Sequence, residues 1–182
     1  TTEGFFRDWN TGFAVLSCCY GCTANGSIPA QFLPKTSGMP GPSPILLIDD
    51  SPGECELFRQ ALTKTGYQGR LDIVEGGHAA MAYLNAQAQH PEPALILLDL
   101  KLRGERGVDV LKRIKQETRV AHIPVVILTS SDDAADVRAC YSAGANGYVV
   151  KPGQFDDLVT LSLHLWKFWL EHNCTQRMTA SC

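Results

Sequence analysis

Acidic residues directly follow two strongly apolar runs of this sequence. Asp49 and Asp50 come after Ile45-Leu46-Leu47-Ile48, and Asp99 comes after a run that ends at Leu98. Neighbouring carboxylates repel each other and lose hydration when buried, so a buried cluster of them predicts a bound cation. Hard oxygen ligands favour Mg²⁺. Because a carboxylate beside Mg²⁺ can attack phosphorus, the pattern points to phosphoryl transfer.

A hydroxyl and an ammonium group occupy equivalent places after two later apolar runs. Thr129 and Ser130 follow the run over 123–128, and Lys151 follows the run over 147–150. A threonine hydroxyl can donate a hydrogen bond to a phosphoryl group, and a lysine ammonium can offset the charge on its oxygens. A fold that gathers these side chains with the acids could therefore hold an aspartyl phosphate.

The elements that must position these residues alternate between strand-length apolar runs and helical patterns. Val108, Leu111 and Ile114 show the helical spacing. Strands that are apolar throughout and are separated by helices predict a parallel sheet covered on both faces. We therefore expect an α/β, (βα)5 doubly wound domain, whose ligands bind beyond the carboxyl ends of the strands. The expected strands lie at 45–48, 71–74, 94–98, 123–128 and 147–150.

Four motifs resemble, in order and spacing, the receiver domain of two-component response regulators. They are LIDDSP, ILLDLKLRGERG, VVILTSS and GANGYVVKP, within residues 45 to about 171. The resemblance implies a flavodoxin-like fold, a five-stranded parallel sheet with strand order 2-1-3-4-5. It also implies a single-domain regulator of a phosphorelay that takes a phosphoryl group from a histidine kinase. Such a protein phosphorylates and dephosphorylates itself with Mg²⁺ and is not otherwise an enzyme.

The same resemblance assigns the acceptor and the metal ligands. Asp99 would be the phosphoacceptor and would also bind the metal. Asp50 would touch Mg²⁺ directly, and Asp49 would act through metal-bound water. The backbone carbonyl of Lys101 would complete the protein's share of the coordination.

The resemblance also names the residues that respond to the phosphoryl group. Lys151 would pair with the phosphoryl oxygens. Thr129 and Tyr148 would form the switch pair, with Thr129 drawn toward the phosphate and Tyr148 turning inward. The bond between Lys151 and Pro152 matches a cis peptide bond of the family.

The loop after Asp99 departs from the family's pattern at two positions. Receiver domains commonly have Pro where this chain has Arg103 and an acid where it has Arg106. We expect neither change to touch the acidic cluster, and we expect the two guanidinium groups to alter the choice of partner. Lys101 lies at a position through which the family tunes phosphate lifetime. Our hypothesis is that Lys101 shields the phosphoryl group from water.

Composition favours one globular domain between two extensions. Residues 1–43 are expected to be a flexible extension or leader whose Cys18-Cys19-Tyr20-Gly21-Cys22 cluster is incidental, residues 44–172 the receiver domain, and residues 173–182 a short tail. A formal net charge of −3 gives no reason to expect nucleic acid or an anionic membrane as partner. The seven cysteines are odd in number and a disulfide framework suits short secreted chains, so we expect a reduced, cytoplasmic setting. No apolar run approaches the roughly 18–20 residues that span a bilayer.

The last expected helix has more apolar surface than one sheet can cover. Two seams run along it, displaced by roughly 140° at about 100° per residue. One seam suffices to pack on the sheet, so we expect a homodimer through the second seam, with Trp166 as an anchor and with the face that carries Tyr148. The seams are Leu158, Leu161, Leu165, Phe168 and Trp169, and Val159, Leu163, Trp166 and Leu170.

Short sequence stretches indicate a sub-family, and two alternative functions remain to be compared with it. LLDLKL and LWKFWLEHN look most like the stand-alone response regulators that partner phytochrome-type histidine kinases. A phosphatase that forms an aspartyl phosphate is the first alternative, but it usually carries a second acid two residues after the nucleophile, where this chain has Lys101. A degenerate receiver acting as a scaffold is the second alternative, and the intact set of acids, hydroxyl and lysine argues against it.

Overall fold

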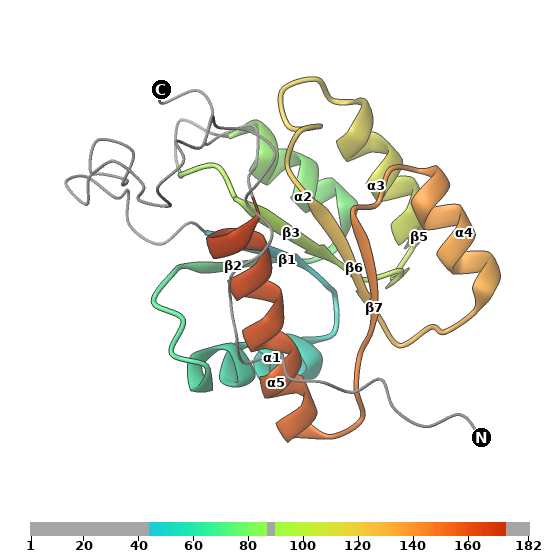
Figure 1. Ribbon diagram of the computed structural model, residues 1–182. Helices are drawn as coiled ribbons and strands as arrows, with labels where there is room; N and C mark the ends of the chain where they lie inside the picture. Colours follow the sequence, from blue (N-terminus) through green and yellow to red (C-terminus); the bar gives the residue numbers. More distant parts are fainter. Residues whose placement is uncertain (1–43, 87–89, 174–182) are drawn as a thin grey trace, which may run out of the picture. The chain divides into compact units, whose positions relative to one another are not determined.

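A single parallel sheet forms the centre of the protein. The structure, a computed structural model, describes residues 44–86 and 90–173. Within them the five-stranded sheet has the order β2-β1-β3-β6-β7 (Figure 1). This is the order 2-1-3-4-5 of the five alternating units, so the predicted fold is confirmed. The strands are β1 (Ile45–Ile48), β2 (Leu71–Val74), β3 (Leu95–Leu98), β6 (Val125–Thr129) and β7 (Gly147–Val150).

Helices cover both faces of this sheet. Helices α1 and α5 lie on one face, and α2, α3 and α4 lie on the other (Figure 1). Among the described residues, no helix is both long and apolar enough to cross a membrane. The helices are α1 (Pro52–Lys64), α2 (Gly76–Asn85), α3 (Gly107–Gln116), α4 (Ala134–Ser142) and α5 (Phe155–Trp166), which continues as the π-helix η2 (Lys167–His172).

The central strands are buried because both of their faces are covered. Successive side chains of a strand point to opposite faces. Leu46 and Ile48 of β1 join the core that contains α2 and α3, whereas Ile45 and Leu47 join the core that contains α1 and α5. The apolar character of every position in the run at 45–48 therefore has a structural reason, and the acids that follow emerge at the carboxyl edge.

A two-stranded hairpin follows β3, and the sequence reading missed it. Strands β4 (Lys101–Leu102) and β5 (Glu105–Arg106) pair antiparallel. Glu105 anchors the hairpin, because its Oε1 accepts a hydrogen bond from the Gly77 backbone N–H at 2.5 Å and its Oε2 pairs with Arg113. The hairpin is thereby tied to the first turn of α2 and to α3.

The end of the last helix differs from the two seams expected there. Trp166 packs toward α1, and its Nε1–H donates to Thr65 Oγ1 at 2.9 Å, so its assignment to an outward seam is wrong. Phe168, placed on the sheet-facing seam, is 54% exposed. A π-helical turn holds more residues than an α-helical turn, so the 100° step does not apply along η2. The predictions for residues 1–43 and for the tail after residue 173 lie outside the described residues.

Candidate functional site

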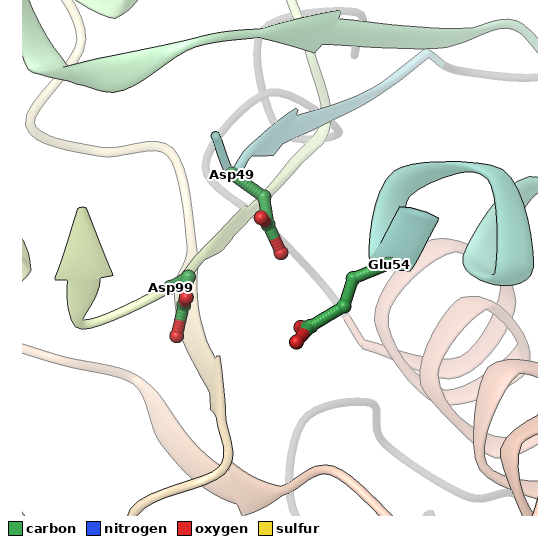
Figure 2. A group of neighbouring side chains, drawn as sticks. All are labelled: Asp49, Glu54 and Asp99. Carbon is green, nitrogen blue, oxygen red and sulfur yellow. The ribbon is translucent and has the colours of Figure 1, made fainter. Parts of the chain in front are cut away.

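Carboxylates from three elements meet at the carboxyl edge of the sheet. Asp49 follows β1, Asp99 follows β3, and Glu54 lies in the first turn of α1; all three side chains point toward a common space (Figure 2). One carboxylate oxygen of each lies within 4.8 Å of the others. Asp49 and Asp99 are buried, whereas Glu54 is exposed. Two of the three acids predicted to gather here do so, and Glu54 is a member that the sequence analysis missed.

Lys151 places its ammonium group among these carboxylates. Its Nζ lies 2.6 Å from Asp49 Oδ2 and 3.9 Å from Asp99 Oδ2, and it also pairs with Glu54. Burial alone would lower the pKa of Lys151, but the hydrogen bonds to Asp49 and Glu54 outweigh it and the pKa is raised. Lys151 is therefore a charged counter-ion within reach of the predicted acceptor.

Backbone hydrogen bonds of the sheet fix where these side chains emerge. The Asp99 N–H donates to the Ile48 carbonyl at 3.0 Å, which extends the pairing of β1 with β3 by one residue. The Lys151 N–H donates to the Thr129 carbonyl at 2.7 Å, which extends β7 along β6. Asp99 and Lys151 are thus each the next residue after a strand of the sheet, and strand register fixes their positions.

A close backbone approach follows Asp99, the predicted acceptor. A Cβ atom at Gly107 would lie 2.2 Å from the Asp99 carbonyl oxygen, and the Gly107 N–H donates to the Leu100 carbonyl at 3.0 Å. Only glycine permits this approach. Gly107 therefore lets α3 begin directly beside the acceptor loop.

The Asp50 carboxylate contacts Arg103. Its Oδ2 accepts a hydrogen bond from the Arg103 backbone N–H at 2.5 Å, and Arg103 Nε lies 3.7 Å from the same oxygen. Asp50 is not part of the group formed by Asp49, Glu54 and Asp99. The expectation that the change at residue 103 leaves the acidic cluster untouched is wrong, because the new residue supplies a backbone donor and a cation to one of the predicted ligands.

The predicted switch residues both contact Ser131. Thr129 is fully buried at the end of β6, and its Oγ1 accepts a hydrogen bond from the Ser131 N–H at 3.4 Å. The Tyr148 hydroxyl donates to the Ser131 carbonyl at 3.0 Å, while its ring is half-buried against the core below α3 and α4. The loop after β6 therefore links the two side chains.

Two further expectations concern the rim of the site. Lys101 Nζ donates to Ser130 Oγ at 3.1 Å, so this side chain spans from the hairpin to the loop after β6. None of the described residues has a cis peptide bond, so the cis bond expected between Lys151 and Pro152 is wrong. The trans form is the lower-energy form of such a bond, by about 0.5–1 kcal/mol.

The donor set fits a divalent cation. The clustered carboxylates supply hard oxygen ligands of the kind that Mg²⁺ and Mn²⁺ prefer. Burial raises the pKa of Asp49 despite its hydrogen bond to Lys151, so burial disfavours the charged form of this carboxylate. A divalent cation beside it would favour that charged form.

Glu54 escaped the sequence reading because it does not follow a strand. It lies five residues after Asp49 in a helix whose first turn begins at Pro52. Proline favours the first turn of a helix, so the start of α1 could have been placed there and Glu54 assigned to the turn nearest the acids. A carboxylate in a first helical turn also has an ordinary explanation, the favourable interaction with the helix dipole, so its type alone did not single it out.

Comparisons with known proteins agree with this geometry. The family model described as "Response regulator receiver domain" matches residues 45–162. Response regulator Rcp1 of Synechocystis sp. is 39% identical over 133 residues, which cover 71% of this chain and 90% of that protein. The crystal structure of the Mn²⁺-bound form of Rcp1 is 38% identical with a TM-score of 0.66, over 74% of this chain and 99% of that chain. The structure of the phosphorylated cyanobacterial phytochrome response regulator RcpA is 31% identical with a TM-score of 0.68, over 74% and 98%.

Proposed function

Because this chain belongs to the family of response regulator receiver domains, we propose that Asp99 is the residue that accepts the phosphoryl group. The observation that carries the proposal is the placement of Asp99, which is 7% exposed at the sheet edge with Lys151 Nζ 3.9 Å from its Oδ2. Asp99 Oδ1 accepts a hydrogen bond from the Leu100 N–H at 2.8 Å, which orients the carboxylate. The donor is the phosphohistidine of a sensor histidine kinase in the cytoplasm.

The transfer exchanges one bond to phosphorus for another. A carboxylate oxygen of Asp99 attacks phosphorus and forms the O–P bond, while the N–P bond of the donor breaks and its imidazole leaves with the electron pair. Lys151 can offset the negative charge of the transferred group, because its ammonium group already lies near Asp99 and can pair with the phosphoryl oxygens. Burial of the acceptor keeps water away from the product and so prolongs its lifetime.

The metal requirement of this site rests on the residues that surround the acceptor. Asp49, Asp50, Asp99 and the backbone carbonyl of Lys101 would hold Mg²⁺, which, when bound, offsets negative charge on the phosphoryl oxygens. The buried carboxylates and their compact spacing support this assignment. Glu54 adds a further negative charge at the mouth of the same space.

Thr129 and Tyr148 connect the acceptor to the surface. Thr129 lies at the carboxyl edge and can donate its hydroxyl hydrogen to a phosphoryl oxygen on Asp99. A shift of Thr129 changes its contact with Ser131, whose carbonyl accepts the Tyr148 hydrogen bond. We infer that Tyr148 then turns further inward and alters the face formed by β7 and its neighbouring helices.

The partners follow from the relatives and from the last helix. RcpA is described as a phytochrome response regulator, which supports a phytochrome-type histidine kinase as the phosphodonor of this chain. The exposed Phe168 on η2 supports a homodimer through the last helix. The output of the protein is then contact with other proteins, altered by phosphorylation.

Intact-mass measurement tests the proposal directly. The protein is incubated with Mg²⁺ and a small phosphodonor such as acetyl phosphate, with Asp99→Asn and Asp109→Asn treated alongside. We expect the parent and Asp109→Asn to gain one phosphoryl group and Asp99→Asn to gain none. Asp109 is a suitable control because it is exposed on α3 and pairs with Lys112 instead of facing the site. A parent protein that gains no mass, or an Asp99→Asn variant that still does, would overturn the assignment.

A further inference from the structure

Arg103 stands at the tip of the hairpin that follows the acceptor. Strands β4 and β5 pair Leu102 with Glu105, which leaves Arg103 and Gly104 as the two-residue turn. The N–H of the first central residue of such a turn takes no part in the ladder, so it is available to an outside acceptor. In this protein that acceptor is Asp50, whose Oδ2 lies 2.5 Å from the Arg103 nitrogen.

The contact depends on which residue occupies the turn. Proline, which receiver domains commonly carry at this position, has no backbone N–H and could not make the hydrogen bond. Arginine supplies the N–H and adds a guanidinium 3.7 Å from the same carboxylate oxygen. Arg103 therefore contacts Asp50, the residue that the proposed function assigns as a metal ligand.

We propose that Arg103 is a latch that competes with the divalent cation for Asp50 and lowers the metal affinity of this site. The inference rests on the proposed function, because it takes Asp50 to be a metal ligand. Asp50 gives up the Arg103 hydrogen bond when its carboxylate joins Asp49 and Asp99 around a cation. Binding of the metal thus releases the tip of the hairpin.

The backbone donor carries most of this effect. A hydrogen bond from N–H to an ionised carboxylate is stronger than one between neutral groups, and Asp50 is largely buried. The Arg103 side chain is 85% exposed, so solvent and salt screen its attraction to Asp50. Removal of the N–H should therefore raise metal affinity more than removal of the guanidinium.

Calorimetric titration with Mg²⁺ separates these contributions. Arg103→Pro removes both the N–H and the guanidinium, and Arg103→Ala removes only the guanidinium. Arg106→Ala removes an exposed arginine of the same hairpin, on β5 opposite Lys101. Gly104 has a φ of 82°, the left-handed value that glycine supplies at the second central residue of a tight turn, and receiver domains commonly carry Pro before it. We expect about tenfold tighter binding for Arg103→Pro, about twofold or less for Arg103→Ala, and parental binding for Arg106→Ala.

Asp50→Asn distinguishes failure of the latch from failure of the site. If Asp50→Asn weakens Mg²⁺ binding while Arg103→Pro binds as the parent does, the latch is wrong and the site assignment stands. If Asp50→Asn binds Mg²⁺ as the parent does, both are overturned. The Arg103 amide proton gives a second readout that needs no substitution: its NMR shift should move upfield as Mg²⁺ saturates the parent, and a hydrogen-bonded shift that persists at saturation contradicts the latch.

Discussion

At the scale of single residues, the site balances its negative charge with two internal cations. Lys151 lies among Asp49, Glu54 and Asp99, and Arg103 holds Asp50 apart from them. The raised pKa of Lys151 stabilises the fold at every pH below its ordinary value of 10.5, and this contribution is lost as pH rises through the higher pKa of the folded state. The protein thus retains a compensated acidic site without a bound metal, and metal binding rearranges existing ion pairs.

Lys101 provides the prediction that belongs to this scale. Its Nζ donates to Ser130 Oγ at 3.1 Å, so the side chain spans from the hairpin that follows Asp99 to the loop after β6. We expect Lys101→Ala to lose its phosphoryl group about threefold faster than the parent, because water then reaches the phosphorus more easily, which corresponds to less than about 1 kcal/mol of barrier. Decay of the phosphorylated mass with time measures the rate.

Lys112→Ala is the matched control for that rate. Lys112 is an exposed lysine of α3 that pairs with Asp109 and lies outside the site, so its removal should leave the decay unchanged. A Lys101→Ala variant that keeps its phosphate as long as the parent would remove the shielding hypothesis.

The individual site residues were predictable to different degrees. Asp49 and Asp99 follow buried strands, Thr129 ends one, and Lys151 follows the partly buried edge strand β7. Parallel strands bring such residues to one edge of the sheet. The orientation of the Asp50 side chain was not predictable in this way, because it depends on which residue at the hairpin tip offers a donor. That donor comes from the backbone of Arg103, and backbone donors carry no signature in the sequence.

At the scale of elements, an aromatic contact packs the end of α5 beside the end of α1. The Trp166 ring lies 5.6 Å from the Tyr67 ring, centroid to centroid, and its Nε1–H donates to Thr65 Oγ1. Thr65 in turn donates its hydroxyl hydrogen to the Leu62 carbonyl at 2.6 Å, at the end of α1. Trp166 therefore makes its contacts within the same chain, which the spacing of apolar residues alone could not reveal.

This contact region makes the stability of the fold sensitive to alkaline pH. Burial raises the pKa of Tyr67 to about 12, above the ordinary value of 10.0. The unfolded chain therefore loses its Tyr67 proton first, so the contribution of this group is complete below pH 10 and disappears as pH rises toward 12. We expect Tyr67→Phe to lose less free energy of unfolding than the parent between about pH 8 and about pH 11, measured by urea denaturation.

Tyr141→Phe serves as the control for this comparison. Tyr141 is 52% exposed on α4, so its replacement should leave the parental pH dependence in place. Part of the dependence should remain in Tyr67→Phe as well, because burial also raises the pKa of Tyr83. Equal pH dependence in the parent and in Tyr67→Phe would contradict the prediction.

The elements themselves followed closely from the sequence, apart from one strand boundary, the hairpin and the π-helical turn. The run expected at 123–128 forms β6 over Val125–Thr129, since Pro124 has no N–H to donate to a neighbouring strand. The hairpin of β4 and β5 was missed because two-residue strands leave no detectable alternation. The π-helical turn of η2 was missed because periodicity assumes a constant step per residue.

At the scale of the whole molecule, burial of the last helix leaves one large aromatic side chain outside. Trp169 packs with the core on the α1 side, and its ring meets the Phe168 ring edge-on with centroids 5.1 Å apart. Phe168 is 54% exposed. Exposed aromatic residues supported by a fixed neighbour are favoured interface anchors, so this face remains the one proposed for the homodimer.

Light scattering after size-exclusion chromatography tests that assembly. We expect the parent to form a dimer at high micromolar concentration, and Phe168→Ala to weaken it by about tenfold or more, because the anchor and its buried area are lost. Leu57→Ala is the control, since Leu57 is similarly exposed but lies on α1. A loss in Leu57→Ala but not in Phe168→Ala would move the interface to the α1 side. A parent that stays monomeric both with and without beryllofluoride, a phosphate mimic, would exclude a dimer through this helix, and signalling would then depend on contacts with other proteins alone.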